Sequence, residues 1–298
     1  MSALHPAPAN GPEVGRTMEV DGAHIHYRED GVGPTVLLLH PAGLSLATFR
    51  QSIPFLSRYL RVLAPDLPGL GYSTLPEGSP ATPEEMARLL ARFLETLSVT
   101  GAVVCGVGEG ALVGLELACR RPDLVGALLL CAPGSLTRHF PWQMKLLLHR
   151  HVGALALRFM TPATVERMLR WAYFNEIAVN PALVDEVWQP LSTLPARLAL
   201  RRALLAYDDR YALSRMGSLT CPVRILWGED DLGRPCGMAD LYHETIAGAT
   251  VRILRNCGGL PQEEKPREFN DEVVRLAAQA RPLPDPDGPD SPFYDGLD

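Results

Sequence analysis

The sequence has no long apolar run and no clustered cysteines. The apolar run 36–39, for example, ends at His40-Pro41, far short of the roughly 20 residues that span a bilayer, so we expect no membrane partner. The polar, proline-containing segment Met1–Thr17 lacks the charged start and apolar run of a secretory signal. The six cysteines form no C-x-x-C pair, which argues against a disulfide framework or a zinc site. We therefore expect a reducing, cytoplasmic setting.

The chain also has no excess of basic residues. Its 298 residues carry a formal net charge of -6, and the arginines are spread along the chain without an aromatic-interleaved patch. We therefore predict no nucleic-acid partner and expect a small molecule instead. A hydrophobic content of 47% is enough for a sizeable core, and a homodimer is left open. The frequent Ala, Leu, Arg, Gly and Pro are typical of a GC-rich bacterial genome.

Short apolar runs bounded by Gly, Pro or Asp recur along the chain. Residues 17–30 alternate in polarity and predict a hairpin that turns at Asp21-Gly22. The clearest helix, 83–98, starts with a capping box of Thr82 and Glu85. Buried strands are predicted at 35–39, 61–64, 102–105, 127–130, 223–227 and 251–254. This alternation predicts an α/β protein with a mostly parallel, doubly wound sheet.

The strand pattern stops between residues 134 and 220, where helical periodicity continues alone. We interpret 134–220 as a helical cap inserted into a core formed by 17–133 and 221–280. Residues 1–16 are predicted to be a flexible N-terminus. Residues 281–298 are rich in Pro and Asp, so we predict a disordered acidic tail.

Five motifs occur in a characteristic order. They are His40-Pro41-Ala42-Gly43, the D-x-P-G-x-G-x-S loop 66–73, the glycine-rich stretch 106–110, the acidic loop 227–231 and the segment 256–269. Together they resemble the α/β-hydrolase superfamily, especially cap-bearing members such as epoxide hydrolases, haloalkane dehalogenases and carbon-carbon bond hydrolases. The resemblance implies the α/β-hydrolase fold with a cap over the active site.

The resemblance breaks down at the catalytic residues. Asp231 matches the acid of the family's triad, but Gly108 stands where the nucleophile belongs and Gly259 where the histidine base belongs. Glycine has no atom for either role. A register shift would make Glu109 the nucleophile, but Val107 would then occupy a position that needs a small residue.

Two catalytic features are predicted to survive this loss. The resemblance implies an oxyanion hole formed by the backbone amides of Ala42 and Glu109. The Glu109 side chain is a candidate proton shuttle beneath an apolar cap, and its alternative role is to favour the helix dipole. Asp231 is either a second acid/base or a vestige that hydrogen-bonds loop amides.

The cap and the loop after residue 39 supply the pocket candidates. These are His40, Trp142, Trp171 and Tyr173, each of which is also compatible with a packing role. The first hypothesis is an enzyme of specialised metabolism that lacks the Ser-His pair and carries out cofactor-free cyclisation, isomerisation or elimination on an apolar small molecule. The alternatives are a non-catalytic binder or receptor, and a hydrolase with a displaced nucleophile such as Ser45, Ser73, Ser135, a cysteine or a residue of the cap. No cofactor or metal is predicted.

Overall fold

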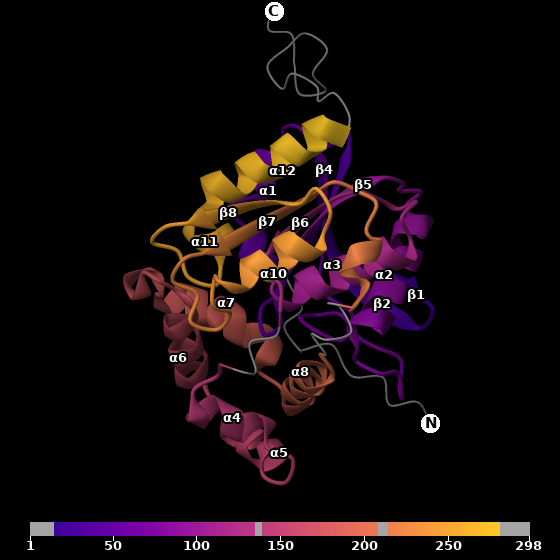
Figure 1. Cartoon of the computed structure of the whole chain (residues 1–298). Helices are drawn as coiled ribbons and strands as arrows, with labels where there is room; N and C mark the ends of the chain where they lie inside the picture. Colours follow the sequence, from indigo (N-terminus) through magenta and orange to yellow (C-terminus); the bar gives the residue numbers. More distant parts are fainter. Residues whose placement is uncertain (1–14, 135–138, 208–213, 281–298) are drawn as a thin grey trace, which may run out of the picture.

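The computed structural model describes residues 15–134, 139–207 and 214–280, and eight strands in it form one sheet (Figure 1). The order is β1-β2-β4-β3-β5-β6-β7-β8, in which β1 and β2 pair antiparallel and the strands from β4 to β8 run parallel. The strands are β1 (Arg16–Val20), β2 (Ala23–Asp30), β3 (Thr35–Leu39), β4 (Arg61–Pro65), β5 (Ala102–Val107), β6 (Val125–Cys131), β7 (Val223–Gly228) and β8 (Thr250–Leu254). The predicted hairpin and the mostly parallel sheet are both confirmed. The predicted tail 281–298 and most of the predicted N-terminal segment 1–16 lie outside the described residues.

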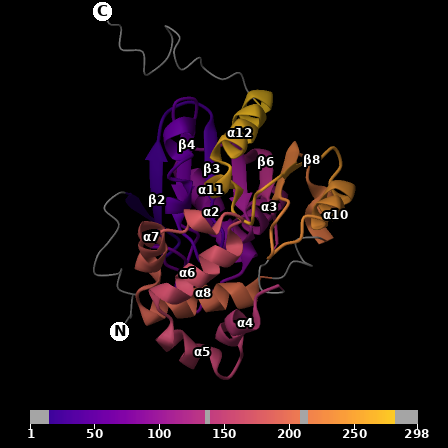
Figure 2. The same ribbon diagram turned by 90° about the vertical axis from the view of Figure 1, so that its left-hand side faces the viewer.

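Helices cover both faces of the sheet (Figure 2). Successive residues of a strand point to opposite faces, so Leu37 and Leu39 of β3 pack in one core and Val36 and Leu38 in the other. The first core includes residues of α2 (Pro83–Thr96), α3 (Glu109–Arg120) and α10 (Met238–Thr245), and the second includes residues of η1 (Leu46–Phe49), α1 (Ile53–Leu56) and α12 (Pro266–Ala280). Burial on both faces explains why these strands are continuous apolar runs.

Helix α2 starts where the sequence predicts and ends earlier. The Thr82 hydroxyl accepts a hydrogen bond from the Glu85 amide at 3.4 Å, and Pro83 occupies the first helical position. The helix was predicted to reach Ser98, but Ser98 has a φ of 54°, which lies outside the right-handed helical region. The last helical residue is therefore Thr96.

The chain between β6 and β7 forms a helical cap. Its elements are α4 (Trp142–Leu148), α5 (Gly153–Ala156), η3 (Leu157–Phe159), α6 (Pro162–Ala172), η4 (Glu176–Ala178), α7 (Pro181–Leu191), α8 (Leu194–Ala206) and η5 (Met216–Ser218). Figures 1 and 2 both show the cap helices beyond one end of the sheet, with α4 and α5 furthest from it. Within the described residues, no helix combines the length and apolarity needed to cross a bilayer.

Candidate active site

The turn between β5 and α3 has the backbone of a nucleophile-bearing elbow but carries no side chain. Gly108 has φ 55° and ψ −118°, a conformation that favours glycine. The helix that follows packs closely on the sheet, because a Cβ on Gly110 would lie 2.4 Å from the Leu39 carbonyl oxygen. The elbow is therefore fixed by backbone packing, and the space above it is open to another side chain.

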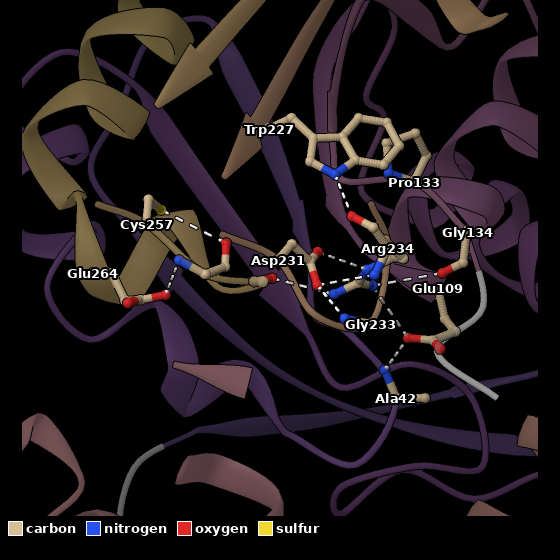
Figure 3. Close-up of polar contacts among 12 residues, drawn as sticks. Ala42, Glu109, Pro133, Gly134, Trp227, Asp231, Gly233, Arg234, Cys257 and Glu264 are labelled. Atoms are coloured by element: carbon tan, nitrogen blue, oxygen red, sulfur yellow. Dashed lines mark hydrogen bonds and ion pairs between the residues drawn. The ribbon is translucent and has the colours of Figure 1, made fainter. Parts of the chain in front are cut away.

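The Arg234 side chain fills that space, and Figure 3 shows it between Asp231 and Glu109. A Cβ built on Gly108 would lie 2.1 Å from Arg234 Nη1, and the Arg234 residue is only 2% exposed. Its Nη1 donates to the Gly134 carbonyl at 3.5 Å and its Nη2 to the Gly259 carbonyl at 3.2 Å. The buried Trp227 indole holds the loop by donating to the Arg234 carbonyl at 2.8 Å. A guanidinium thus occupies the volume that a nucleophile would need.

Asp231 holds this guanidinium in place. Its Oδ2 accepts from Arg234 Nε at 3.2 Å, and its Oδ1 accepts from the backbone amides of Gly233 at 2.8 Å and Arg234 at 3.0 Å. This geometry favours the reading in which Asp231 hydrogen-bonds loop amides over a role as a second acid/base. The carboxylate is now the anchor of an arginine.

Sequence reasoning did not single out Arg234. The available signal was Asp231, at the end of the acidic loop, followed three residues later by an arginine. That spacing allows an ion pair in a tight turn, but the sequence does not show that the long side chain crosses to the glycine elbow.

Glu109 is fully buried on the other side of the guanidinium. Its Oε2 accepts from the Ala42 amide at 3.3 Å and lies 3.9 Å from Arg234 Nη1. The carboxylate therefore contacts an amide that was predicted to bind a substrate oxyanion. Its negative charge also adds to the effect of burial in raising the pKa of Tyr207. The guanidinium thus lies between two buried carboxylates, those of Asp231 and Glu109.

An apolar cavity adjoins this cluster beneath the cap. The space not filled by atoms, which continues into solvent, amounts to about 610 Å³. Among the described residues that line it, Arg234 carries the only charge. The lining is Pro41, Ala42, Gly43, Leu44, Phe140, Met144, Met160, Val165, Met168, Leu169, Trp171, Ala172, Val187, Leu191, Leu200, Arg234 and Leu260. Glu109 does not line the cavity but lies directly behind Ala42 and Arg234, which do.

One of the four predicted pocket residues lines this cavity, namely Trp171. Tyr173 is buried and faces a separate outer cleft, where burial raises the pKa of its hydroxyl. Trp142 was placed in the pocket by the sequence, but it is 74% exposed and absent from the lining. The reason is the helical repeat, since α4 turns Met144 toward the cavity and positions two residues apart face away from each other.

His40 lies below the cavity as a structural residue. Its Nε2 accepts from the Leu67 amide at 2.8 Å and its Nδ1 donates to the Pro41 carbonyl at 2.9 Å, so the ring is neutral. Burial lowers the pKa of His40 from its ordinary value of 6.5, against the weaker raising effects of Asp66 and Pro41.

This lowered pKa predicts a loss of stability in mild acid. Below pH 6.5 the unfolded chain binds a proton at His40 that the folded protein excludes. The free energy of unfolding therefore holds its full value above pH 6.5 and declines as the pH falls below that value. Urea midpoints at about pH 7.5 and about pH 5.5 should differ less in His40→Gln than in the unmodified protein. His149→Gln, at an exposed position, should leave the difference unchanged. An unaltered pH dependence in His40→Gln would show that other groups control it.

Four of the residues proposed as displaced nucleophiles have surroundings that do not favour that role. The Ser45 hydroxyl accepts from the Ala47 amide, and the Ser73 hydroxyl donates to the Asp66 carbonyl at 2.8 Å. Burial raises the pKa of the Cys105 and Cys257 thiols, which disfavours the reactive thiolate. Ser135 lies outside the described residues.

Restoring a serine at the elbow is expected to harm the protein. In Gly108→Ser the new Cβ displaces Arg234 and must adopt a positive φ, at a cost of about 1 to 3 kcal/mol in free energy of unfolding. The new serine is not expected to add ester hydrolysis, because Gly259 supplies no base. Urea unfolding and nitrophenyl acetate hydrolysis measure the two effects. Gly237→Ser is the control, since nothing lies within 4 Å of its Cβ position, and an equal loss there would contradict the steric explanation.

The chain has sequence similarity to known hydrolases. Residues 36–272 match the model of the Alpha/beta hydrolase family. The chain is similar to the uncharacterized hydrolase YugF of Bacillus subtilis, with 24% identity over 87% of this chain and 96% of that protein. It is also similar to 2-hydroxy-6-oxo-6-phenylhexa-2,4-dienoate hydrolase of Comamonas testosteroni, with 25% identity over 86% of this chain and 91% of that protein.

Solved structures share the fold. A serine hydrolase involved in carbazole degradation superposes with a TM-score of 0.76 at 20% identity, covering 89% of this chain and 99% of that one. The epoxide hydrolase CorEH gives a TM-score of 0.75 at 21% identity, covering 90% of this chain and 99% of that one. At such identities the likeness concerns the fold alone.

Proposed function

Since the chain belongs to the Alpha/beta hydrolase family, we propose that it uses the family's pocket for a reaction other than serine-dependent hydrolysis. The reaction is a cofactor-free cyclisation, isomerisation or elimination of an apolar small molecule that carries a carbonyl or carboxylate group. The observation that carries this proposal is the Arg234 guanidinium, which Asp231 holds in the space where a side chain on Gly108 would lie.

Glycine at the predicted nucleophile and base positions argues against serine-type catalysis by the elbow itself. In subtilisin, loss of the nucleophile or of the base costs about 10⁶ in turnover. Here the predicted nucleophile and base positions are both glycine, and the arginine that lies beside them is a cation without nucleophilic character. Arg234 does suit a substrate oxygen, because it presents a charge to an otherwise apolar wall.

Glu109 completes the mechanism as a proton acceptor. A substrate oxygen can accept a hydrogen bond from the Ala42 amide and lie close to Arg234. It then competes with the Glu109 carboxylate, which makes both of these contacts in the structure. When a carbon–hydrogen bond beside the carbonyl breaks, its proton moves to Glu109 and its electron pair becomes an enolate whose oxygen faces Ala42 and Arg234. The negative charge passes from Glu109 to the substrate oxygen, so the total charge of the buried cluster is unchanged. The proton then returns to another atom of the substrate.

The relatives support the substrate class. The Comamonas testosteroni protein is named for a dienoate that bears an oxo group and a phenyl group. A molecule of that kind combines an apolar body with polar oxygens, which is the combination that the apolar cavity and Arg234 suit. We place the reaction in bacterial specialised metabolism, in the cytoplasm.

The test compares metabolites of the source organism with and without the gene by mass spectrometry, and then adds purified protein to the deletion extract. Conversion of an accumulated compound into an isomer, or into a product that has lost water or an acid, is the expected result. Products whose combined composition equals the substrate plus one water would instead identify a hydrolase with a displaced nucleophile. A compound retained unchanged by the protein would identify a binder or receptor.

A further inference from the structure

The end of the cap that lies furthest from the sheet exposes large apolar side chains. We define the cap tip as residues 139–159, which include α4, α5 and η3. Trp142 is 74% exposed, Phe159 75% and Leu155 56%. Leu146 and Val152 are exposed as well. Such side chains cost free energy in water, so their gathering on one projecting end indicates a contact surface.

The charged residues of the cap tip are all of one sign. Residues 139–159 contain no Asp or Glu, and Lys145, Arg150 and Arg158 are exposed among the apolar side chains. Helix α8 packs against α4, and its residue Arg202 is exposed too. The whole chain nevertheless has a net charge of -6, so the basic character is local.

We propose that the cap tip binds the surface of an anionic lipid bilayer. Trp142 and Phe159 enter the boundary between headgroups and acyl chains, while Lys145, Arg150 and Arg158 meet the lipid phosphates. Exposed aromatic side chains mixed with cations, and the lack of acidic residues, are the composition that such interfaces favour. This proposal revises the expectation of no membrane partner, which rested on the lack of a spanning segment.

The charge pattern argues against a second copy of the chain as the occupant. Two cap tips placed face to face would bring cations together without an acidic partner within residues 139–159. The tip also projects from the molecule in both views (Figures 1 and 2), which is the shape that contact with a flat lipid surface requires.

The surface and the cavity share a helix. Met144 of α4 lines the cavity, while Trp142 and Leu146 of the same helix are exposed. An apolar molecule dissolved in the bilayer would therefore meet the cap beside the cavity. Binding to lipid does not require the proposed reaction, so either proposal can fail without the other.

Vesicle flotation with the full-length protein tests the proposal. We expect the protein to float with phosphatidylglycerol–phosphatidylcholine vesicles, to remain behind with pure phosphatidylcholine, and to be released by high salt. Lys145→Glu with Arg150→Glu, and separately Trp142→Ala with Phe159→Ala, should each lower the bound fraction at least roughly tenfold. The control is Ile177→Ala, because Ile177 is 89% exposed but lies in η4 outside the cap tip.

Three outcomes would overturn the proposal. The first is no flotation with anionic vesicles at low salt, and the second is flotation that the cap-tip variants leave unchanged. The third is salt-sensitive binding to soluble polyglutamate without flotation, which would make the tip a docking surface for an acidic protein.

Discussion

Replacement of Arg234 by methionine is expected to lower the free energy of unfolding by about 3 to 5 kcal/mol and to abolish turnover. Methionine fills the space of the arginine stem but carries no guanidinium, so the buried Asp231 carboxylate loses its Nε partner and Glu109 loses the neighbouring cation. A carboxylate left without its cation in a buried site is far costlier than a surface one. Urea unfolding gives the stability, and substrate conversion gives the turnover.

Two further variants separate charge from packing. Arg16→Met removes an exposed ion pair with Glu29, so it should change stability by less than about 1 kcal/mol. Adding Asp231→Asn and Glu109→Gln to Arg234→Met removes the unpaired charges and should recover much of the lost stability without restoring turnover. If the single and triple variants are equally unstable, packing rather than charge accounts for the loss.

The Glu109→Gln variant should lower turnover by about 10² to 10⁴ while the fold is kept. The amide oxygen of glutamine can still accept from the Ala42 amide, so the local geometry is retained while the group that takes the proton is removed. Turnover on the substrate identified from the deletion extract measures the loss, and a thermal melt checks the fold.

The matched control is Glu116→Gln on the same helix. Glu116 is also buried, but its carboxylate pairs with Arg120 and Arg215, whereas that of Glu109 contacts Ala42 and Arg234 at the cavity wall. This variant should lose stability and keep turnover. Full turnover in Glu109→Gln would contradict the role of Glu109 as a proton shuttle and leave Arg234 as the catalytic contact.

The sequence predicts the strands well because a parallel sheet covered on both faces requires continuous apolar runs between turn residues. The predicted run 35–39, for example, coincides with β3. The elbow can be predicted equally well, since glycines at 106, 108 and 110 leave room for close packing.

The site is harder to predict from the sequence because it depends on contacts between distant segments. Two glycines indicate that side chains are missing but do not indicate what fills the space. Arg234 reaches Gly134 and Gly259 across the fold, and no local pattern encodes that path. Trp142 shows the same limit, because helical spacing gives the relative directions of side chains but not which of them faces inward.

The arginine at the elbow also bears on how this chain can evolve. A serine-histidine pair at this elbow would require three changes, namely Gly108→Ser, Gly259→His and the loss of Arg234. A Cβ at position 108 would lie 2.1 Å from the guanidinium, and one at 259 would lie 3.1 Å from both Arg234 Nη2 and Asp231 Oδ1. Because the three positions share one space, their effects are strongly non-additive, and each single step is deleterious on its own. Single substitutions toward a serine site are therefore disfavoured, and selection would more easily elaborate the arginine site than replace it.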